Sequence, residues 1–399
     1  MKKIIKYLHL DEIGVLELIF AFYCILSGYV YGKFLGTIVV MLIMAMIALR
    51  RGKCNNISLR KLSMLYAFIV FHECLLILVL GIHGSLLNRL ISISIVMGCM
   101  YPVVRAINYN KMLGALNCVA LISIGGILYH FIIIRSGGMI TPIKLPFMPE
   151  MEQTSRLYAE MNRPTSFYWE PAAFVTYMMV PLFLSLHEKK FLWSTIIIVS
   201  MFLSTSSTGI LMSVVVLIAY ILTQKVETKY KVGALFAGLT VVLILTNTDY
   251  FLAGVEKIET TDIESTSRLI NGPLMVKSMP FSDLITGMKA STPYEYYMSG
   301  GFYDPGILLK DDNMFVSAFW FVLAKYGIIG LFLFLSLYYD FVKRCRASIP
   351  FMVYVFFSLF FQSLKPGDAG FAFHVIFMLV FVYHTSLKQY ESKDKRANI

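Results

Sequence analysis

The sequence predicts an all-α protein that crosses a membrane many times. Hydrophobic residues make up 58% of its 399 residues and charged residues only 15%, whereas a typical soluble domain is about 25% charged. Long apolar stretches recur along the chain, and the lysines and arginines gather in short segments between them. A chain with so few polar residues cannot cover a core of this size in water. We therefore expect lipid to solvate the protein. The net charge of +11 is therefore attributed to membrane topology and not to nucleic-acid binding.

Twelve apolar stretches approach the length of a spanning helix, which is about 20 residues for about 30 Å of hydrocarbon. Several are short, so their ends are expected a few residues further out. We predict spans at 13–31, 34–49, 62–81, 90–107, 112–134, 171–186, 191–205, 210–222, 232–246, 327–341, 349–364 and 371–387. The chain 1–399 is expected to form a single membrane-embedded domain.

The positive charges predict that both termini are cytoplasmic. Cytoplasmic segments of membrane proteins carry the excess of Lys and Arg. With the N-terminus inside, the inner segments hold 22 of the 35 Lys and Arg residues, and twelve spans return the C-terminus to the same side. The basic segment 1–6 precedes the first span without a small-residue cleavage site, so an uncleaved first helix is expected.

Two connections are much longer than the rest, and both fall on the outer side. They run from about 135 to 170 and from about 249 to 326. Long loops are usually functional or disordered, and the aromatic residues and prolines in these two argue against disorder. Within the second loop, 313–325 (NMFVSAFWFVLAK) predicts a short helix at the outer interface, with Lys325 reaching water. Gly327 is expected to break this helix from the following span.

The most informative stretch is RPTSFYWEP at 163–171, which ends the first outer loop. Pro171 suits the first position of a helix, and Glu170 suits the positive end of its dipole, so a structural role is one explanation. Arg163 presents a planar fork of donors that binds phosphate in bidentate fashion. At a membrane surface its natural partner is a lipid phosphate or a phosphorylated lipid substrate.

This stretch resembles the Arg…Phe…Glu-Pro signature of the bacterial O-antigen and capsule polymerases of the Wzy type, whose relatives include the O-antigen ligases. Further features agree with it in order and topology between about 160 and 340. They are a Ser/Thr patch between two spans (204–209), a large outer loop beginning Ser-Thr-Ser-Arg (265–268), its Leu-Ile-Thr-Gly run (284–287), and the closing segment 313–331. The first five spans match the family only in being hydrophobic.

The resemblance implies an enzyme of the bacterial cytoplasmic membrane that acts at the outer face. It transfers a glycan from a polyprenyl diphosphate carrier to a sugar hydroxyl of another lipid-linked repeat unit. Donor and acceptor are therefore lipid-linked oligosaccharides, and a chain-length regulator is a further candidate partner. No nucleotide sugar is available outside the cell. The chain also shows no Asp-x-Asp motif and no His/Cys cluster at metal-ligand spacing, so no metal or cofactor is expected.

The resemblance also implies roles for particular residues. The attacking hydroxyl needs a base within hydrogen-bond reach, and the leaving diphosphate needs fixed cations. The implied cations are Arg163 and Arg268, the implied bases are Glu170 or Asp312, and the implied substrate-binding residues are Ser166, Tyr168 and Asn313. The structural alternatives are a solvated loop residue for Arg268 and a helix N-cap for Asp312.

Two departures from the family bear on the reaction. The Ser/Thr patch often ends in Arg in this family, whereas Thr208 and Gly209 stand there in this chain. The ligases commonly carry His-Asn ahead of the closing helix, whereas this chain has Asp312 and Asn313. The missing His favours a polymerase over a single-transfer ligase and assigns the base to a carboxylate.

Ionisable residues inside the predicted spans support a rival function. Glu17, His72, Glu73 and His374 lie within apolar stretches, where such residues are costly to bury and mark transport paths by default. His72 and Glu73 in particular favour a flippase or transporter of lipid-linked oligosaccharides. Adjacent residues on a helix point about 100° apart, so the alternative is a pair bonded to neighbouring helices.

Overall fold

The structure is a computed structural model that describes residues 2–31, 34–52, 55–81, 84–151, 163–223, 229, 263–309, 314–344 and 349–397. Every predicted span overlaps a helix except 232–246, which lies outside the described residues. The first helices are α1 (Lys2–Tyr7), α2 (Val15–Leu26), α3 (Gly36–Arg51), α4 (Arg60–Leu80), α5 (Gly84–Ala106) and α6 (Tyr109–Arg135). The later apolar helices are α8 (Pro171–His187), α9 (Phe191–Leu203), α10 (Ser207–Thr223), α16 (Ala318–Arg344), α17 (Ile349–Phe360) and α18 (Ala369–Ala397).

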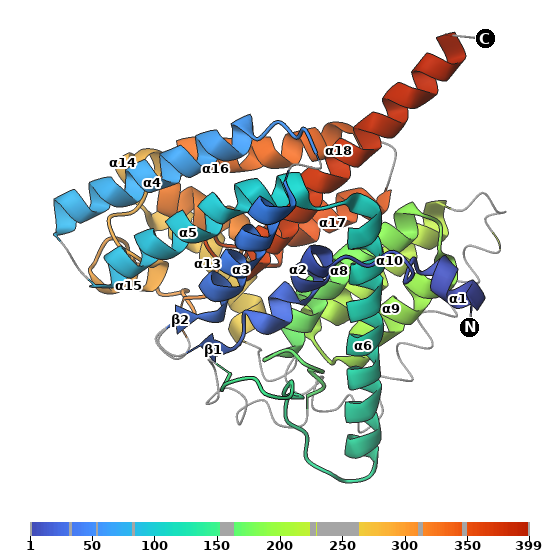
Figure 1. Ribbon diagram of the computed structural model, residues 1–399. Coiled ribbons are helices and arrows are strands. Elements are labelled where there is room, and N and C mark those ends of the chain that lie inside the picture. Colours follow the sequence, from blue (N-terminus) through green and yellow to red (C-terminus); the bar gives the residue numbers. More distant parts are fainter. Residues whose placement is uncertain are drawn as a thin grey trace.

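The second outer loop folds into three helices in its described part. They are α13 (Ile263–Ser278), α14 (Phe281–Thr286) and α15 (Pro293–Met298), which gather around the first half of α16 (Figure 1). The only departure from helix among the described elements is a strand pair of β1 (Val30–Tyr31) and β2 (Phe34–Leu35), between α2 and α3.

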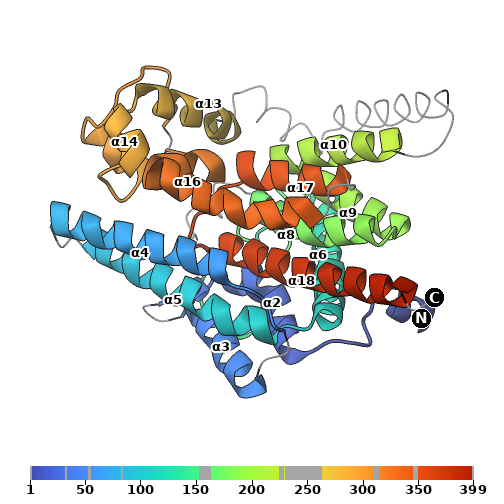
Figure 2. The same ribbon diagram turned by 90° about the horizontal axis from the view of Figure 1, so that it is seen from above.

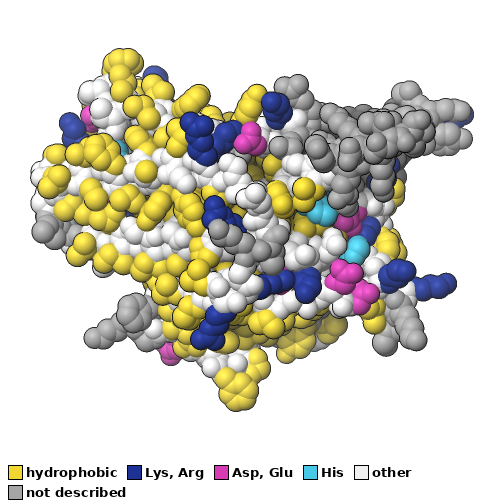
Figure 3. All heavy atoms as spheres, turned by 45° about the horizontal axis from the view of Figure 1, so that its top comes forward, with side chains coloured by type: hydrophobic (Ala, Val, Ile, Leu, Met, Phe, Trp, Pro, Cys, Tyr) yellow, Lys and Arg dark blue, Asp and Glu magenta, His cyan; other side chains and the backbone are white. Residues whose placement is uncertain are grey.

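The helices are those of a multi-pass membrane protein. Within the described residues, α4, α5, α6, α16 and α18 are long and apolar enough to cross a membrane, and α2, α8, α9, α10 and α17 are shorter apolar helices. The outward face of α4 is apolar, with Phe71 60% and Leu78 79% exposed, whereas Leu65 and Ile69 on its other face are fully buried. Figure 3 shows hydrophobic side chains over much of one face of the molecule. Such a surface needs lipid as its solvent.

Connections that were predicted to share one side of the membrane contact one another. On the predicted outer side, the Val30 N–H of the strand pair donates to Glu150 O of the first outer loop at 3.0 Å. On the predicted inner side, the Asn55 N–H donates to Arg105 O at 2.8 Å. Both ends of the chain lie at the right in Figures 1 and 2, away from α14. These two contacts agree with the predicted grouping of the connections.

The predicted break before the span at 327–341 is confirmed. Gly327 adopts φ 66° and ψ −172° inside α16, which splits this helix into two parts. The prediction that Lys325 reaches water is wrong, because Lys325 is fully buried, and so are Phe321 and Ala324. The Lys325 ammonium group instead contacts the Glu73 carboxylate and donates to Ala290 O inside the protein.

An aromatic core ties the C-terminal helices to α8. The ring of Phe183 in α8 lies with its centroid 5.2–6.0 Å from five other rings, the range in which aromatic pairs attract. These rings belong to Phe341, Phe351, Tyr354, Phe377 and Phe381 of α16, α17 and α18. The packing fixes α17 and α18, and with them the short connection that faces the start of α8.

Candidate functional site

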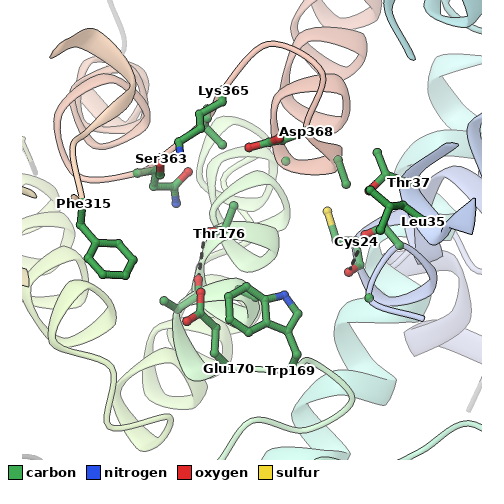
Figure 4. Close-up of a pocket in the computed structure, with 18 residues that line it drawn as sticks. Cys24, Leu35, Thr37, Trp169, Glu170, Thr176, Phe315, Ser363, Lys365 and Asp368 are labelled. Carbon is green, nitrogen blue, oxygen red and sulfur yellow. Dashed lines mark hydrogen bonds between the residues drawn. The ribbon is translucent and has the colours of Figure 1, made fainter. Parts of the chain in front are cut away.

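A cavity of about 420 Å³ opens where four connections of the predicted outer side meet. Its walls come from the turn between α2 and α3, the start of α8, the segment before α16, and the connection between α17 and α18 (Figure 4). Glu170 and Trp169 of the motif line it, and so does Phe315 of the second outer loop. Parts of both long outer loops therefore converge on one cavity.

Three charged side chains line the cavity, and they come from two opposite walls. Glu170 stands at the start of α8, and Lys365 and Asp368 stand across the cavity on the connection between α17 and α18 (Figure 4). The Lys365 Nζ lies 5.1 Å from the ring centroid of Phe321, which holds it by a cation–π interaction. The site thus combines two carboxylates, one ammonium group and the half-buried ring of Trp169.

Glu170 occupies the N-cap position of α8. Its backbone is extended, with φ −148° and ψ 157°, and Pro171 follows at the first helical position. Its carbonyl oxygen accepts the Phe174 N–H at 3.3 Å. The carboxylate, however, makes no capping hydrogen bond to the first turn of α8. Capping therefore does not account for a carboxylate at this edge of the cavity.

The backbone of the motif is anchored to α6 through His130. The His130 Nδ1 accepts the N–H groups of Thr165 and Ser166 at 3.3 and 3.4 Å. Ser166 is fully buried with φ 57°, and its carbonyl accepts the Ile143 N–H at 2.8 Å. Sequence reasoning did not single out His130, although a histidine near the end of an apolar stretch was a signal that could have found it.

Tyr168 lies in the protein interior. It is 1% exposed, its hydroxyl lies 3.3 Å from Ser123 Oγ, and its ring packs on those of Phe174 and Tyr177. Burial raises the pKa of the Tyr168 phenol well above its ordinary value, so the side chain stays neutral. The structure places neither Ser166 nor Tyr168 on the cavity wall. Their contacts instead position the chain that leads into Trp169 and Glu170.

Arg163 contacts the Ser/Thr patch. Its Nη2 donates to Thr205 O at 3.2 Å, in the turn between α9 and α10, where Thr205 adopts φ 53°. Two features of the family resemblance, the motif and the patch, therefore lie side by side. Arg163 is not among the residues that line the cavity. The structure thus brings Arg163 to the patch and Glu170 to the cavity.

The remaining predicted site residues belong to the second outer loop. Arg268 lies in α13, but its side chain is outside the described part of the structure, and so are Asp312 and Asn313. Asn271 of α13 is fully buried; its Nδ2 donates to Leu308 O at 2.8 Å and to Phe315 O at 3.3 Å. This clamp fixes the segment that presents Phe315 to the cavity.

A buried cluster of charges joins α4, α5 and α16. Glu73 Oε1 lies 3.2 Å from Arg89 Nε and 3.5 Å from Lys325 Nζ, and it accepts the Tyr326 hydroxyl at 3.1 Å. Glu73 and Lys325 are both fully buried. The Arg89 Nη2 also donates to the Tyr326 hydroxyl at 3.3 Å. One carboxylate is therefore shared by two cations.

Backbone carbonyls of the second outer loop complete this cluster. The Lys325 Nζ donates to Ala290 O at 2.6 Å, Arg89 Nη1 donates to Ser291 O, and His72 Nε2 donates to Thr286 O at 3.1 Å. The segment 284–291, which includes the Leu-Ile-Thr-Gly run, is thereby held on α4 and α5. The intramembrane pair is bonded to neighbouring elements, as the structural alternative predicted.

Close backbone packing makes this attachment possible. Gly287 and Gly327 have φ of 93° and 66°, and a Cβ on either would collide with the backbone of the other segment, at Lys325 O and Ile285 O. The Met288 N–H donates to Ala324 O at 2.8 Å between them. Glycine is required at both positions because of its positive φ and the space available.

The other two intramembrane ionisable residues are also bonded. Glu17 Oε1 lies 2.6 Å from Arg51 Nη1 and accepts the Asn108 N–H at 2.8 Å. His374 Nε2 donates to Thr176 O at 3.2 Å, and its Nδ1 contacts the Tyr354 hydroxyl. Paired groups of this kind hold helices together in lipid.

Sequence reasoning missed Lys365 and Asp368. They lie in KPGD at 365–368, a short predicted outer connection. Two charges beside a Pro-Gly turn were the available signal, but nothing in the local pattern placed them opposite Glu170. Among the described residues, no cluster of three or more His, Cys, Asp or Glu side chains could hold a metal ion.

No family model matches the sequence. No curated protein matches it either. Its function is therefore inferred from its own residues and from the short motifs described above.

Proposed function

We propose that the protein polymerises a surface polysaccharide at the outer face of the bacterial cytoplasmic membrane, with both termini in the cytoplasm. It would transfer a glycan from a polyprenyl diphosphate carrier to a sugar hydroxyl of another lipid-linked repeat unit. The observation that carries the proposal is that Glu170 of the motif lines a cavity opposite Lys365 and Asp368, at the meeting point of both long outer loops.

The groups in the cavity suit this transfer. The attacking hydroxyl gives its proton to a carboxylate within hydrogen-bond reach, and Glu170 takes this role. The bond between the sugar and the diphosphate breaks with its electron pair on the diphosphate, whose growing charge a fixed cation stabilises. Lys365 is placed to supply that cation, and the resemblance adds Arg163 and Arg268.

The remaining walls suit a sugar. A cavity of about 420 Å³ falls in the range of about 300–1,000 Å³ that small ligands occupy. A pyranose ring presents an apolar C–H face, which packs on an aromatic ring, and a rim of hydroxyls, which bind carboxylates and amides. Trp169 and Phe315 supply the rings, and Gln362 and Asp368 supply the polar groups.

The test uses the purified full-length protein in lipid vesicles with a polyprenyl-diphosphate-linked repeat and no nucleotide sugar. We expect a ladder of products spaced by one repeat. Glu170→Gln keeps the side-chain volume and removes no capping bond, so it is expected to lower the rate of the folded protein by about 100-fold or more. Glu188→Gln, on the predicted inner side, is the matched control and should polymerise normally.

Two results would contradict the proposal. Polymer formation by Glu170→Gln at the wild-type rate would remove Glu170 from the reaction. Transfer of the intact lipid across sealed vesicles without any product would establish a flippase in place of a polymerase.

A further inference from the structure

A second cavity, of about 410 Å³, lies on the predicted inner side between the start of α4, the last turns of α16 and the middle of α18. Its lining has two parts. Arg60 and Lys61, the first residues of α4, form a basic rim, whereas Leu337, Met378 and Leu379 belong to an aliphatic floor. None of these residues takes part in the proposed reaction, so the cavity is independent of the proposed function.

The predicted topology puts the cavity at the depth of lipid headgroups. Arg60 begins α4, and Asp340 lies in the last turns of α16. Tyr383 and Ser386 lie near the end of the apolar part of α18, which runs to Leu387. Polar side chains therefore mark one end of the cavity, and the aliphatic floor extends from there toward the membrane interior.

The two basic residues are in different electrostatic states. Lys61 Nζ lies 2.9 Å from Asp340 Oδ2, donates to Ser336 O at 3.1 Å and lies 5.1 Å from the Tyr339 ring centroid. Its charge is neutralised by Asp340. Arg60 is exposed, and within the described part of the chain its side chain has no hydrogen bond or ion pair. Arg60 therefore provides an unbalanced positive charge at the mouth of the cavity.

We propose that this cavity binds one anionic phospholipid of the adjacent leaflet. Its phosphate is held by the planar fork of Arg60, which matches phosphate oxygens in geometry. The upper part of an acyl chain lies along Leu337, Met378 and Leu379. A free phosphate ion would use none of this floor. A choline headgroup would bring its own cation to Arg60, so the anionic headgroup is preferred.

The test is native mass spectrometry of the full-length protein, released from detergent after incubation with dioleoyl phosphatidylglycerol or dioleoyl phosphatidylcholine. We expect about one phosphatidylglycerol to stay bound at detergent concentrations that remove phosphatidylcholine. Arg60→Gln is expected to weaken phosphatidylglycerol binding by about fivefold or more, the factor for one cation near a charged membrane surface. Arg50→Gln is the matched control, because Arg50 is exposed on the same predicted side but does not line the cavity.

A second variant separates lipid from a free anion. Leu379→Trp fills the floor and leaves Arg60 in place, so it should also release phosphatidylglycerol. Equal retention of both lipids by the wild type would overturn the proposal, and so would unchanged retention by Arg60→Gln. If inorganic phosphate raises the melting temperature of Leu379→Trp and of the wild type equally, the site binds a small anion and not a lipid.

Discussion

Removal of the Glu73 carboxylate should destabilise the protein far more than removal of either cation beside it. Glu73 is fully buried and lies within 3.5 Å of Lys325 Nζ and 3.2 Å of Arg89 Nε. Glu73→Gln keeps the shape of the side chain but leaves two cations in the interior with no opposite charge. Breaking a buried pair in this way costs about 3–5 kcal/mol.

The charge balance predicts that loss of Lys325 and loss of Glu73 have unequal effects on stability. Lys325→Met leaves Glu73 and Arg89 as a balanced pair, so we expect it to cost less than Glu73→Gln. The double variant removes one charge of each sign, so it should recover much of the stability that Glu73→Gln loses. Such recovery is the mark of a direct interaction between neighbouring groups.

The assay is the loss of the monodisperse peak in size-exclusion chromatography after heating in detergent, for all variants and the wild type. Asp340→Asn is the matched control, because its pair with Lys61 is 48% and 36% exposed and should be worth at most about 1 kcal/mol. If Glu73→Gln and Asp340→Asn melt at the same temperature, the buried cluster does not hold the second outer loop. The reasoning also fails if Lys325→Met proves as destabilising as Glu73→Gln.

Three further predictions follow from single positions. Gly327→Ala forces a side chain into positive φ and against the backbone at the end of α14, so it should cost about 1–3 kcal/mol of stability. Gly125→Ala, in open space within α6, should leave the stability unchanged or raise it by at most about 1 kcal/mol. Asn271→Ala removes three hydrogen bonds to the chain before α16, and faster proteolysis of the second outer loop should report the loss, whereas wild-type cleavage would show that the clamp is not needed. In a cysteine-free background, Lys365→Cys should react with a membrane-impermeant maleimide added outside intact cells and Ser58→Cys should not; the reverse pattern would invert the predicted topology.

Much of the helical architecture could be predicted from local sequence. Lipid requires about 20 apolar residues for each crossing, so a span is visible in its own composition. The fourth helix, Arg60–Leu80, was predicted at 62–81. The break at Gly327 was predicted for a similar reason, since glycine alone adopts positive φ without cost. The placement of Glu170 directly before Pro171 at the start of a helix is another local feature that the pattern indicated.

The candidate site could not be predicted in the same way, because it is formed by contacts between segments far apart in the chain. Lys325 was expected in water because a lysine near a helix end usually reaches it, but Glu73 and Ala290 O supply partners that no local pattern reveals. His130 holds the motif, and Lys365 faces Glu170 across a cavity, through the same kind of distant packing.

The sequence by itself determined that this is a helical membrane protein, which apolar stretches overlap its described helices, and which motif precedes α8. The tertiary structure decided which charges are paired in the interior and which face a cavity. The physical reason is that the cost of burying a charge depends on its partners, and those partners come from other helices.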